Sequence, residues 1–369
     1  MSAGGVDQVT RYERPAGRVP GRTPVRVGPL SGVWRPRTVG VTLVGLVLLG
    51  LVAAVNVGRG DFPISVGEVV AVLFGGGDRA DRFVVLELRL PRTLTGLLVG
   101  AALGLSGAIT QVVARNPLAS PDILGVTAGG SAAAVAVIVL GGGSVAGGGL
   151  LAEVGLPVAA LVGGLGTAAL VYLLAYRRGL DGYRLVLVGV GVGALAAALA
   201  NWLLVVAEIE EAARGTVWLV GSLYARGWEH VVPVGLALVV LVPVALLLAF
   251  PLGALQLGDD TARGLGLRLN RVRAGLVTVA VGLAAVATAS AGPVAFVALV
   301  VPQICQRLVG GARPPLLASA VYGALLTVAA DLLARTALGV ELPVGVVTAI
   351  LGAPYLLHLL VRGNRRVSV

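Results

Sequence analysis

The chain contains no lysine, so all 28 of its basic residues are arginines. A Walker A loop needs a lysine to reach the β- and γ-phosphates of a nucleotide, so an ordinary ATP-hydrolysis site is excluded. The single cysteine, Cys305, excludes an internal disulfide. The two histidines, His230 and His358, lie far apart in the sequence, and we interpret both as packed or interfacial residues rather than metal ligands.

Charge is scarce as well. Only 12% of the residues are charged and 57% are hydrophobic, with a mean hydropathy of +0.95. Soluble domains carry about 25% charged residues, so this composition indicates a membrane protein. A transmembrane helix needs about 20 mostly apolar residues, and a chain of this length holds roughly ten of them with short loops. We therefore expect an all-α, polytopic membrane protein.

Ten apolar segments are predicted to be transmembrane helices. They are Val39–Val57, Leu94–Val113, Ile123–Leu140, Leu156–Tyr176, Leu185–Ala207, Val231–Phe250, Ala274–Ser290, Pro293–Val309, Leu316–Leu333 and Pro343–Val361. In the second span, Gly96, Gly100 and Gly104 recur every four residues. Small residues at this spacing let helix backbones approach closely in lipid, so we expect a packing face there.

Two tails flank the transmembrane domain, which we place at residues 39–362. Residues 1–38 carry seven arginines among scattered prolines and glycines, and we expect a disordered cytoplasmic tail. A secretory signal has a short basic region and an apolar core of about 7–15 residues. Here the basic region is far longer and the apolar run is long enough for a full span, so we expect no cleavage. Residues 363–369 form a short cytoplasmic C-terminal tail.

The net charge of +10 does not indicate nucleic-acid binding, because the arginines recur in short loops between apolar spans. With the N-terminus inside, the inner segments hold 20 arginines and the outer segments hold 8. Without the N-terminal tail the ratio is 13 to 8. Both ratios follow the positive-inside rule, which predicts that both termini are cytoplasmic.

Three arginines stand at outer ends of spans. Arg89 and Arg92 are three residues apart, which places them on one face if the segment is helical. Arg335 ends the ninth span. Such arginines either extend to lipid phosphates or bind carboxylates of a soluble partner, for which the guanidinium group is well suited. The residues alone leave both interpretations open.

Two polar segments stand at the inner surface. The loop at residues 255–270, LQLGDDTARGLGLRLN, predicts a short helix at Asp259–Arg263, with glycines before and after it. It is either a solvated loop or a docking helix for a cytoplasmic partner, and its apolar Leu265 and Leu267 favour docking. The other segment is a proline-punctuated turn at Asn116–Pro121.

No predicted span has a charged residue near its centre. Charged or histidine side chains inside membranes usually mark ion or proton pathways, so their absence disfavours a transporter driven by an ion gradient. An ion-coupled secondary transporter or channel acting alone remains the alternative function. A membrane enzyme would need a nucleophile–base pair or a metal cluster, and the sequence offers neither.

Several motifs give the chain a specific resemblance. The segments LRLPRTL, GAALGLSGAITQ, ARNPLASPDILGVTAG, LGDDTARGLGL and AGPVAFVALVVPQICQRL occur in order, followed by ADLLARTALGVELPVGVVTAILGAPYLLHLLVR. From Asp61 to Arg362 the chain resembles the FecCD-type permeases of ATP-binding-cassette importers for ferric siderophores, haem and vitamin B12. The resemblance implies a ten-span fold like that of the vitamin B12 importer permease.

The resemblance also implies function and partners. We expect a transport subunit that is no enzyme, in the plasma membrane of a bacterium, moving a metal chelate inward, with a ferric siderophore as the first expectation. The implied partners are a second permease copy, identical or paralogous, two cytoplasmic ATPases, an extracytoplasmic substrate-binding lipoprotein and membrane lipid, without nucleic acid. The partner ATPases use ATP, and this chain binds no cofactor or metal.

Site residues follow from the same resemblance. Arg89, Arg92 and Arg335 correspond to arginines that meet acidic residues of the binding protein. The ATPase-coupling segment is Gly258, Asp259, Asp260, Thr261, Ala262, Arg263, Gly264, Leu265, Gly266 and Leu267. The inner gate corresponds to Asp181, Gly182 and Tyr183, where the family has small hydroxyl residues. The residues Asn116, Pro117 and Pro121 form an inner turn that we expect to lie near the ATPase.

Overall fold

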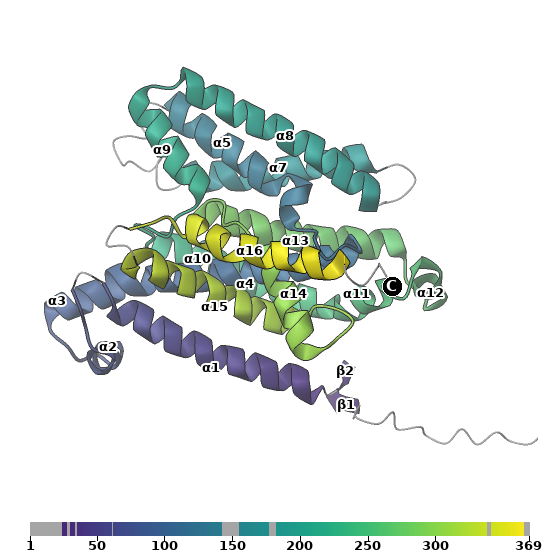
Figure 1. Ribbon diagram of the computed structural model, residues 1–369, viewed down its shortest axis with the longest axis horizontal. Coiled ribbons are helices and arrows are strands. Elements are labelled where there is room, and N and C mark those ends of the chain that lie inside the picture. Colours follow the sequence, from purple (N-terminus) through teal and green to yellow (C-terminus); the bar gives the residue numbers. More distant parts are fainter. Residues whose placement is uncertain are drawn as a thin grey trace, which may run out of the picture.

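The computed structural model describes residues 24–27, 30–33, 35–60, 62–141, 155–176, 182–337 and 341–364. These residues form a bundle of long helices with short elements at both ends (Figure 1). Each predicted span corresponds to one helix, which confirms the all-α fold. The helices are α1 Pro36–Gly58, α4 Leu90–Val113, α5 Val126–Gly141, α7 Leu156–Ala175, α8 Gly182–Val206, α10 Trp228–Leu247, α13 Leu269–Ala291, α14 Val297–Val309, α15 Leu316–Thr336 and α16 Val344–Asn364.

Seven helices of the described chain are long and apolar enough to cross a membrane. One of them, Arg79–Val113, is a continuous helix of 35 residues. It consists of α3 (Arg79–Arg82), the π-helical segment η1 (Phe83–Arg89) and α4. Three further apolar helices are shorter, namely α5, α14 and the part of α16 at Val344–Leu359.

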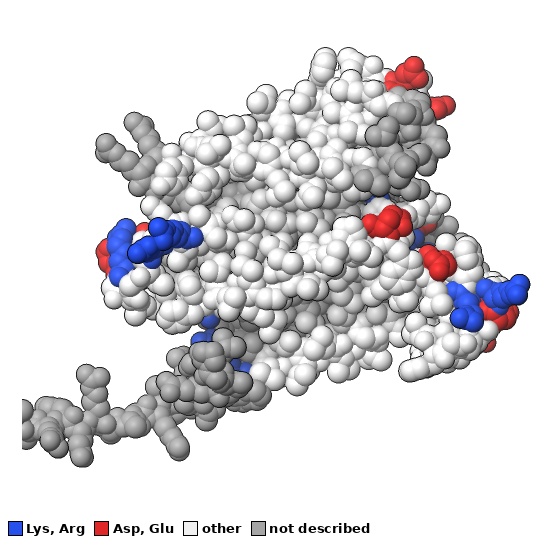
Figure 2. Space-filling view, turned by 180° about the vertical axis from the view of Figure 1, so that it is seen from behind, with Lys and Arg blue, Asp and Glu red and all other residues white. Residues whose placement is uncertain are grey.

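Short elements cover the two ends of the bundle. Helices α2 (Val66–Leu73), α3 and α9 (Ile209–Val220) lie at one end (Figure 1). At the other end lie α11 (Ala249–Leu255), α12 (Asp259–Gly264) and the C-terminus. Following the orientation predicted from the arginines, we call the α12 end the inner end and the opposite end the outer end. Charged side chains gather at both ends and leave an uncharged belt between them (Figure 2).

The N-terminal tail is described only in part, because residues 1–23 lie outside the described residues. Within the segment expected to be disordered, strands β1 (Pro24–Val27) and β2 (Leu30–Val33) pair as an antiparallel hairpin. The hairpin lies at the inner end of α1 (Figure 1). The hairpin was not predicted, because its only alternation of apolar residues, Val25 and Val27 around Arg26, is short and is followed at once by glycine and proline.

Helix α4 forms the centre of the bundle. In the most apolar stretch of Arg79–Val113, 78% of the residues are buried, against 11% in α1 and 17% in α8. Its predicted glycine face packs on α15: the backbone of Gly100 lies against Gly323, and Gly104 lies against Ser319. Backbones approach this closely only where no side chain intervenes. The exposed faces of α1 and α8 are apolar, as required for contact with lipid or another membrane subunit.

We expect Gly104→Ala to destabilise the protein by about 1–3 kcal/mol, because the added Cβ meets the backbone carbonyl of Ser319. The matched control is Gly191→Ala in α8, where an added Cβ has no heavy atom within 4 Å. Thermal unfolding in detergent micelles measures both. Equal unfolding temperatures for the two variants would contradict close packing between α4 and α15.

Candidate functional site

A cluster of charged side chains joins three helices and a loop at the outer end. Asp331 on α15 is 1% exposed, and its carboxylate accepts hydrogen bonds from Arg92 on α4 at 2.7–3.3 Å. The amide of Asn56 on α1 donates to the same carboxylate at 3.2 Å. Arg335, one turn along α15, has its Nε 3.6 Å from Asp331 Oδ2. We call these four residues together with Glu341 the outer ion cluster.

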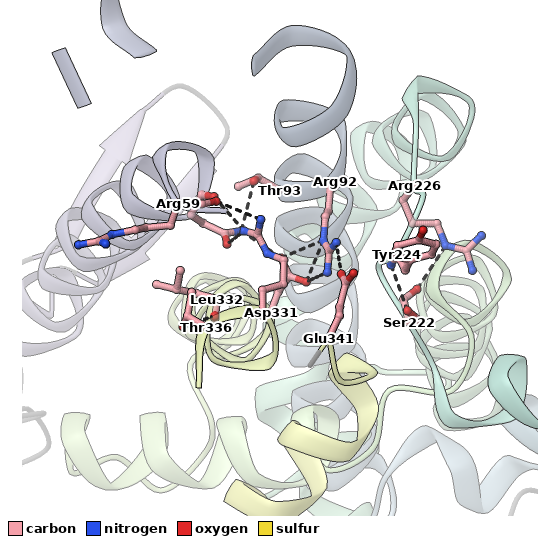
Figure 3. Close-up of polar contacts among 12 residues, drawn as sticks. Arg59, Arg92, Thr93, Ser222, Tyr224, Arg226, Asp331, Leu332, Thr336 and Glu341 are labelled. Atoms are coloured by element: carbon pink, nitrogen blue, oxygen red, sulfur yellow. Dashed lines mark hydrogen bonds and ion pairs between the residues drawn. The ribbon is translucent and has the colours of Figure 1, made fainter. Parts of the chain in front are cut away.

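Glu341 completes the charge balance of the outer ion cluster. It precedes α16 and forms an ion pair with Arg92, so Arg92 lies between two carboxylates (Figure 3). The cluster contains two guanidinium groups and two carboxylates, and its formal charge is zero. Because unpaired buried charges are costly, this pairing is what allows Arg92 and Arg335 to be only 12% exposed.

Arg89 occupies a different position from the other two predicted docking arginines. It is 8% exposed and donates hydrogen bonds to the backbone carbonyls of Val57 and Gly58, both at 3.1 Å. It also donates to the carbonyl of Phe62 at 2.5 Å. The last carbonyls of a helix lack intrahelical partners, and a cation is favourable there. Arg89 thus caps α1 on backbone carbonyls, whereas Arg92 binds the carboxylate of Asp331.

At the inner end, the predicted ATPase-coupling segment forms helix α12. Gly258 and Gly266 flank it with φ values of 100° and 80°, which side chains other than glycine rarely adopt. Within α12 the side chain of Ala262 is fully buried, while Leu265, directly after the helix, is 53% exposed. The segment is therefore a fixed helix with an exposed surface, as its glycine pattern predicts.

Asp259, the first residue of α12, is an ion-pair centre that the sequence did not predict. Its Oδ1 accepts a hydrogen bond from Arg273 on α13 at 2.8 Å and another from Arg115, just beyond the end of α4. Burial opposes ionisation of Asp259, but the charges of Arg273 and Arg115 outweigh it and hold its pKa below the ordinary aspartate value. Arg115 also donates to the carbonyl of Leu255 at 3.1 Å.

The inner turn and the gate lie beside this ion pair. The side chain of Asn116 accepts a hydrogen bond from the amide of Leu118 at 2.9 Å, which closes the turn before Pro121 starts the 3-10 helix η2 (Pro121–Leu124). Of the predicted gate residues, Asp181 lies outside the described residues, whereas Gly182 and Tyr183 begin α8.

Two cavities open at the inner end. A cavity of about 300 Å³ is lined by the gate and the ion pair, namely Val113, Ala114, Arg115, Gly182, Tyr183, Asp259 and Arg273. A second cavity, of about 830 Å³, has Asn116, Pro117 and Gln303 among its lining residues. Within the described part of the chain, no three His, Cys, Asp or Glu side chains are grouped to hold a metal ion.

Comparisons with known proteins give a consistent result. A profile of the FecCD transport family matches residues 46–362. The chain is 41% identical to the ferric enterobactin transport system permease protein FepG of Escherichia coli (strain K12), with 83% of this chain and 91% of FepG covered. It is 38% identical to the iron(3+)-hydroxamate import system permease protein FhuG of Bacillus subtilis (strain 168), with 88% of this chain and 97% of FhuG covered.

A solved structure is similar as well. It is an inward-facing conformation of an ABC transporter of the metal-chelate type. The superposition has a TM-score of 0.77 at 29% sequence identity, and it covers 88% of this chain and 99% of that chain.

We expect Asp331→Asn to lower the free energy of unfolding by about 3–5 kcal/mol, because it leaves two largely buried guanidinium groups without their shared carboxylate. Glu210→Gln on α9 is the control, since it removes the same charge from an exposed position at the same end of the bundle. Chemical or thermal unfolding in detergent compares the two. Similar stability of both variants would mean that Asp331 is not the centre of the cluster.

Proposed function

Because the chain belongs to the FecCD transport family, we propose that it is the permease subunit of an ATP-binding-cassette importer that carries a ferric siderophore into the cytoplasm. The observation that carries this proposal is the family match, which extends over the helical bundle from α1 into α16. The named relatives transport ferric enterobactin and iron(3+)-hydroxamate, and these names support an iron chelate as cargo.

The energy for transport comes from separate subunits in this proposal, since the chain has no lysine for a Walker A loop. Two cytoplasmic ATPases bind the α12 surface of two permease copies, and the transported chelate passes between these copies. ATP binding favours one of two permease conformations through contacts that differ between them. The exposed Leu257 and Leu265 around α12 support docking, because they offer apolar contacts to a partner beside the charged residues of α12.

The outer binding protein docks, in the same proposal, on Arg92 and Arg335. Both arginines are already paired within the outer ion cluster, so docking requires that one of their carboxylate partners be exchanged for a carboxylate of the binding protein. Glu341 is the partner that is displaced, because its side chain is 36% exposed whereas that of Asp331 is 1% exposed. A carboxylate of the binding protein then takes the place of Glu341 on Arg92. Arg89 contributes indirectly, by holding the outer end of α1.

Reconstitution in proteoliposomes tests the transport function. With the ATPase inside and the binding protein outside, we expect uptake of ferric siderophore only when ATP is present in the lumen. Omitting the ATPase stops uptake, whereas an ionophore that collapses ion gradients leaves it unchanged. Uptake that needs no ATPase and disappears with the ionophore would instead establish an ion-coupled carrier acting alone.

Substitutions at the outer end test docking by exchange. We expect Glu341→Gln to tighten binding of the binding protein by about 5- to 10-fold at low salt, a change of roughly 1 kcal/mol. Arg92→Glu weakens binding, and both effects shrink as salt screens the charges. Surface plasmon resonance with the permease in nanodiscs measures the affinities, with Glu210→Gln as the control for loss of an outer negative charge. Unchanged affinity in Glu341→Gln would rule out exchange at Arg92.

A further inference from the structure

At the inner end, one carboxylate, that of Asp259, connects three helices. Asp259 Oδ1 accepts hydrogen bonds from Arg273 at 2.8 Å and from Arg115. Arg273 lies in the first turns of α13, and Arg115 follows the last residue of α4. The starts of α12 and α13 and the end of α4 therefore meet at one oxygen atom. A displacement of α12 either carries the other two helices along or breaks this ion pair.

The backbone conformation of Arg115 directs its side chain toward α12. Arg115 has a φ of 50°, in the left-handed region, which ends α4 abruptly and turns its side chain toward α12. Its guanidinium also donates to the carbonyl of Leu255 at 3.1 Å, the last residue of α11. Arg115 thus holds both sides of the short loop that leads into α12. The side chain of Arg115 is 46% exposed and that of Arg273 is 15% exposed, so the pair is partly shielded from water.

A further contact connects α4 to the gate. A Cβ added at Gly182 would lie 3.6 Å from the carbonyl oxygen of Ala114, so α8 begins directly against the end of α4. Beside this contact, Tyr183 and the residues of the ion pair line the same cavity of about 300 Å³. The series of contacts runs from Asp259 to Arg115, to Ala114 and to Gly182.

We propose that Asp259 is the positioning residue that transmits movement of the ATPase-bound helix α12 to the inner gate, through Arg115 at the end of α4 and Arg273 at the start of α13. This inference rests on the proposed function, since it takes α12 as the ATPase-bound helix. The charges of Arg273 and Arg115 hold the pKa of Asp259 below the ordinary aspartate value, so its carboxylate is ionised at neutral pH and can pair with both arginines.

The test compares uptake with ATP hydrolysis in the complete importer in proteoliposomes. In Asp259→Asn we expect uptake per ATP hydrolysed to fall by about 5- to 100-fold, within the range typical of coupling between sites. The control is Asp122→Asn, an exposed carboxylate at the inner end that accepts a hydrogen bond from Thr127. Its ratio of uptake to ATP hydrolysis stays at the wild-type value.

A labelling experiment separates transmission from folding. The sole cysteine, Cys305, is buried, so a thiol introduced by Tyr183→Cys at a position that is 77% exposed reports on the gate. ATP with vanadate changes the labelling rate of this thiol in the otherwise unaltered importer. Adding Asp259→Asn abolishes that change. A labelling response that is unaffected by Asp259→Asn would overturn the proposal.

Arg115→Gln provides a second variant in case Asp259→Asn does not assemble, because Arg115 lies outside α12. It too lowers uptake per ATP, and the double variant loses no more than the stronger single variant, as expected for two residues acting through one contact. Wild-type ratios in Arg115→Gln, or additive losses in the double variant, would overturn the role of the ion pair. Failure of the proposed function is a separate outcome, in which the unsubstituted complex shows no ATP-dependent uptake.

Discussion

A bilayer offers no hydrogen-bond partner to a charged group, and this constraint determines where the chain places its polar side chains. On the face shown in Figure 2, the described charges gather towards the two ends of the bundle, and the belt between them is uncharged. Even at the ends, the shielded charges described above have ion-pair partners or, as with Arg89, hydrogen bonds to backbone carbonyls. The outer ion cluster neutralises Arg92 and Arg335 with Asp331 and Glu341, and at the inner end Asp259 is shared by two arginines.

Helix α4 connects these two polar ends. Arg92 in its first turn belongs to the outer ion cluster, and Arg115 just beyond its last turn reaches Asp259. Between them, Gly100 and Gly104 hold α4 against α15 at backbone contact. The proposed outer docking site and the proposed coupling helix α12 are therefore connected by one helix, and the sequence between Arg92 and Arg115 carries no charged residue.

The features that the sequence predicts are those encoded locally. Spans follow from length and apolar composition, and α12 follows from glycines that end helices. The ion pairs were not predictable in this way, because their partners are distant in sequence: Arg92 and Asp331 are 239 positions apart, and Arg115 and Asp259 are 144 apart. Only helix packing brings them together. Arg89 was expected to face outward with Arg92, but the π-helical turn before α4 and the open end of α1 place it on backbone carbonyls.

The exclusive use of arginine has a further consequence for how this protein responds to its surroundings. A guanidinium group keeps its proton at every pH that a cell reaches, whereas the ammonium group of a shielded lysine can lose it. The positive partners at both ends are therefore permanent charges. Acidification of the surrounding medium therefore leaves the charge of these arginines unchanged. The exposed face of the importer can then meet acidic and neutral environments with the same set of cations.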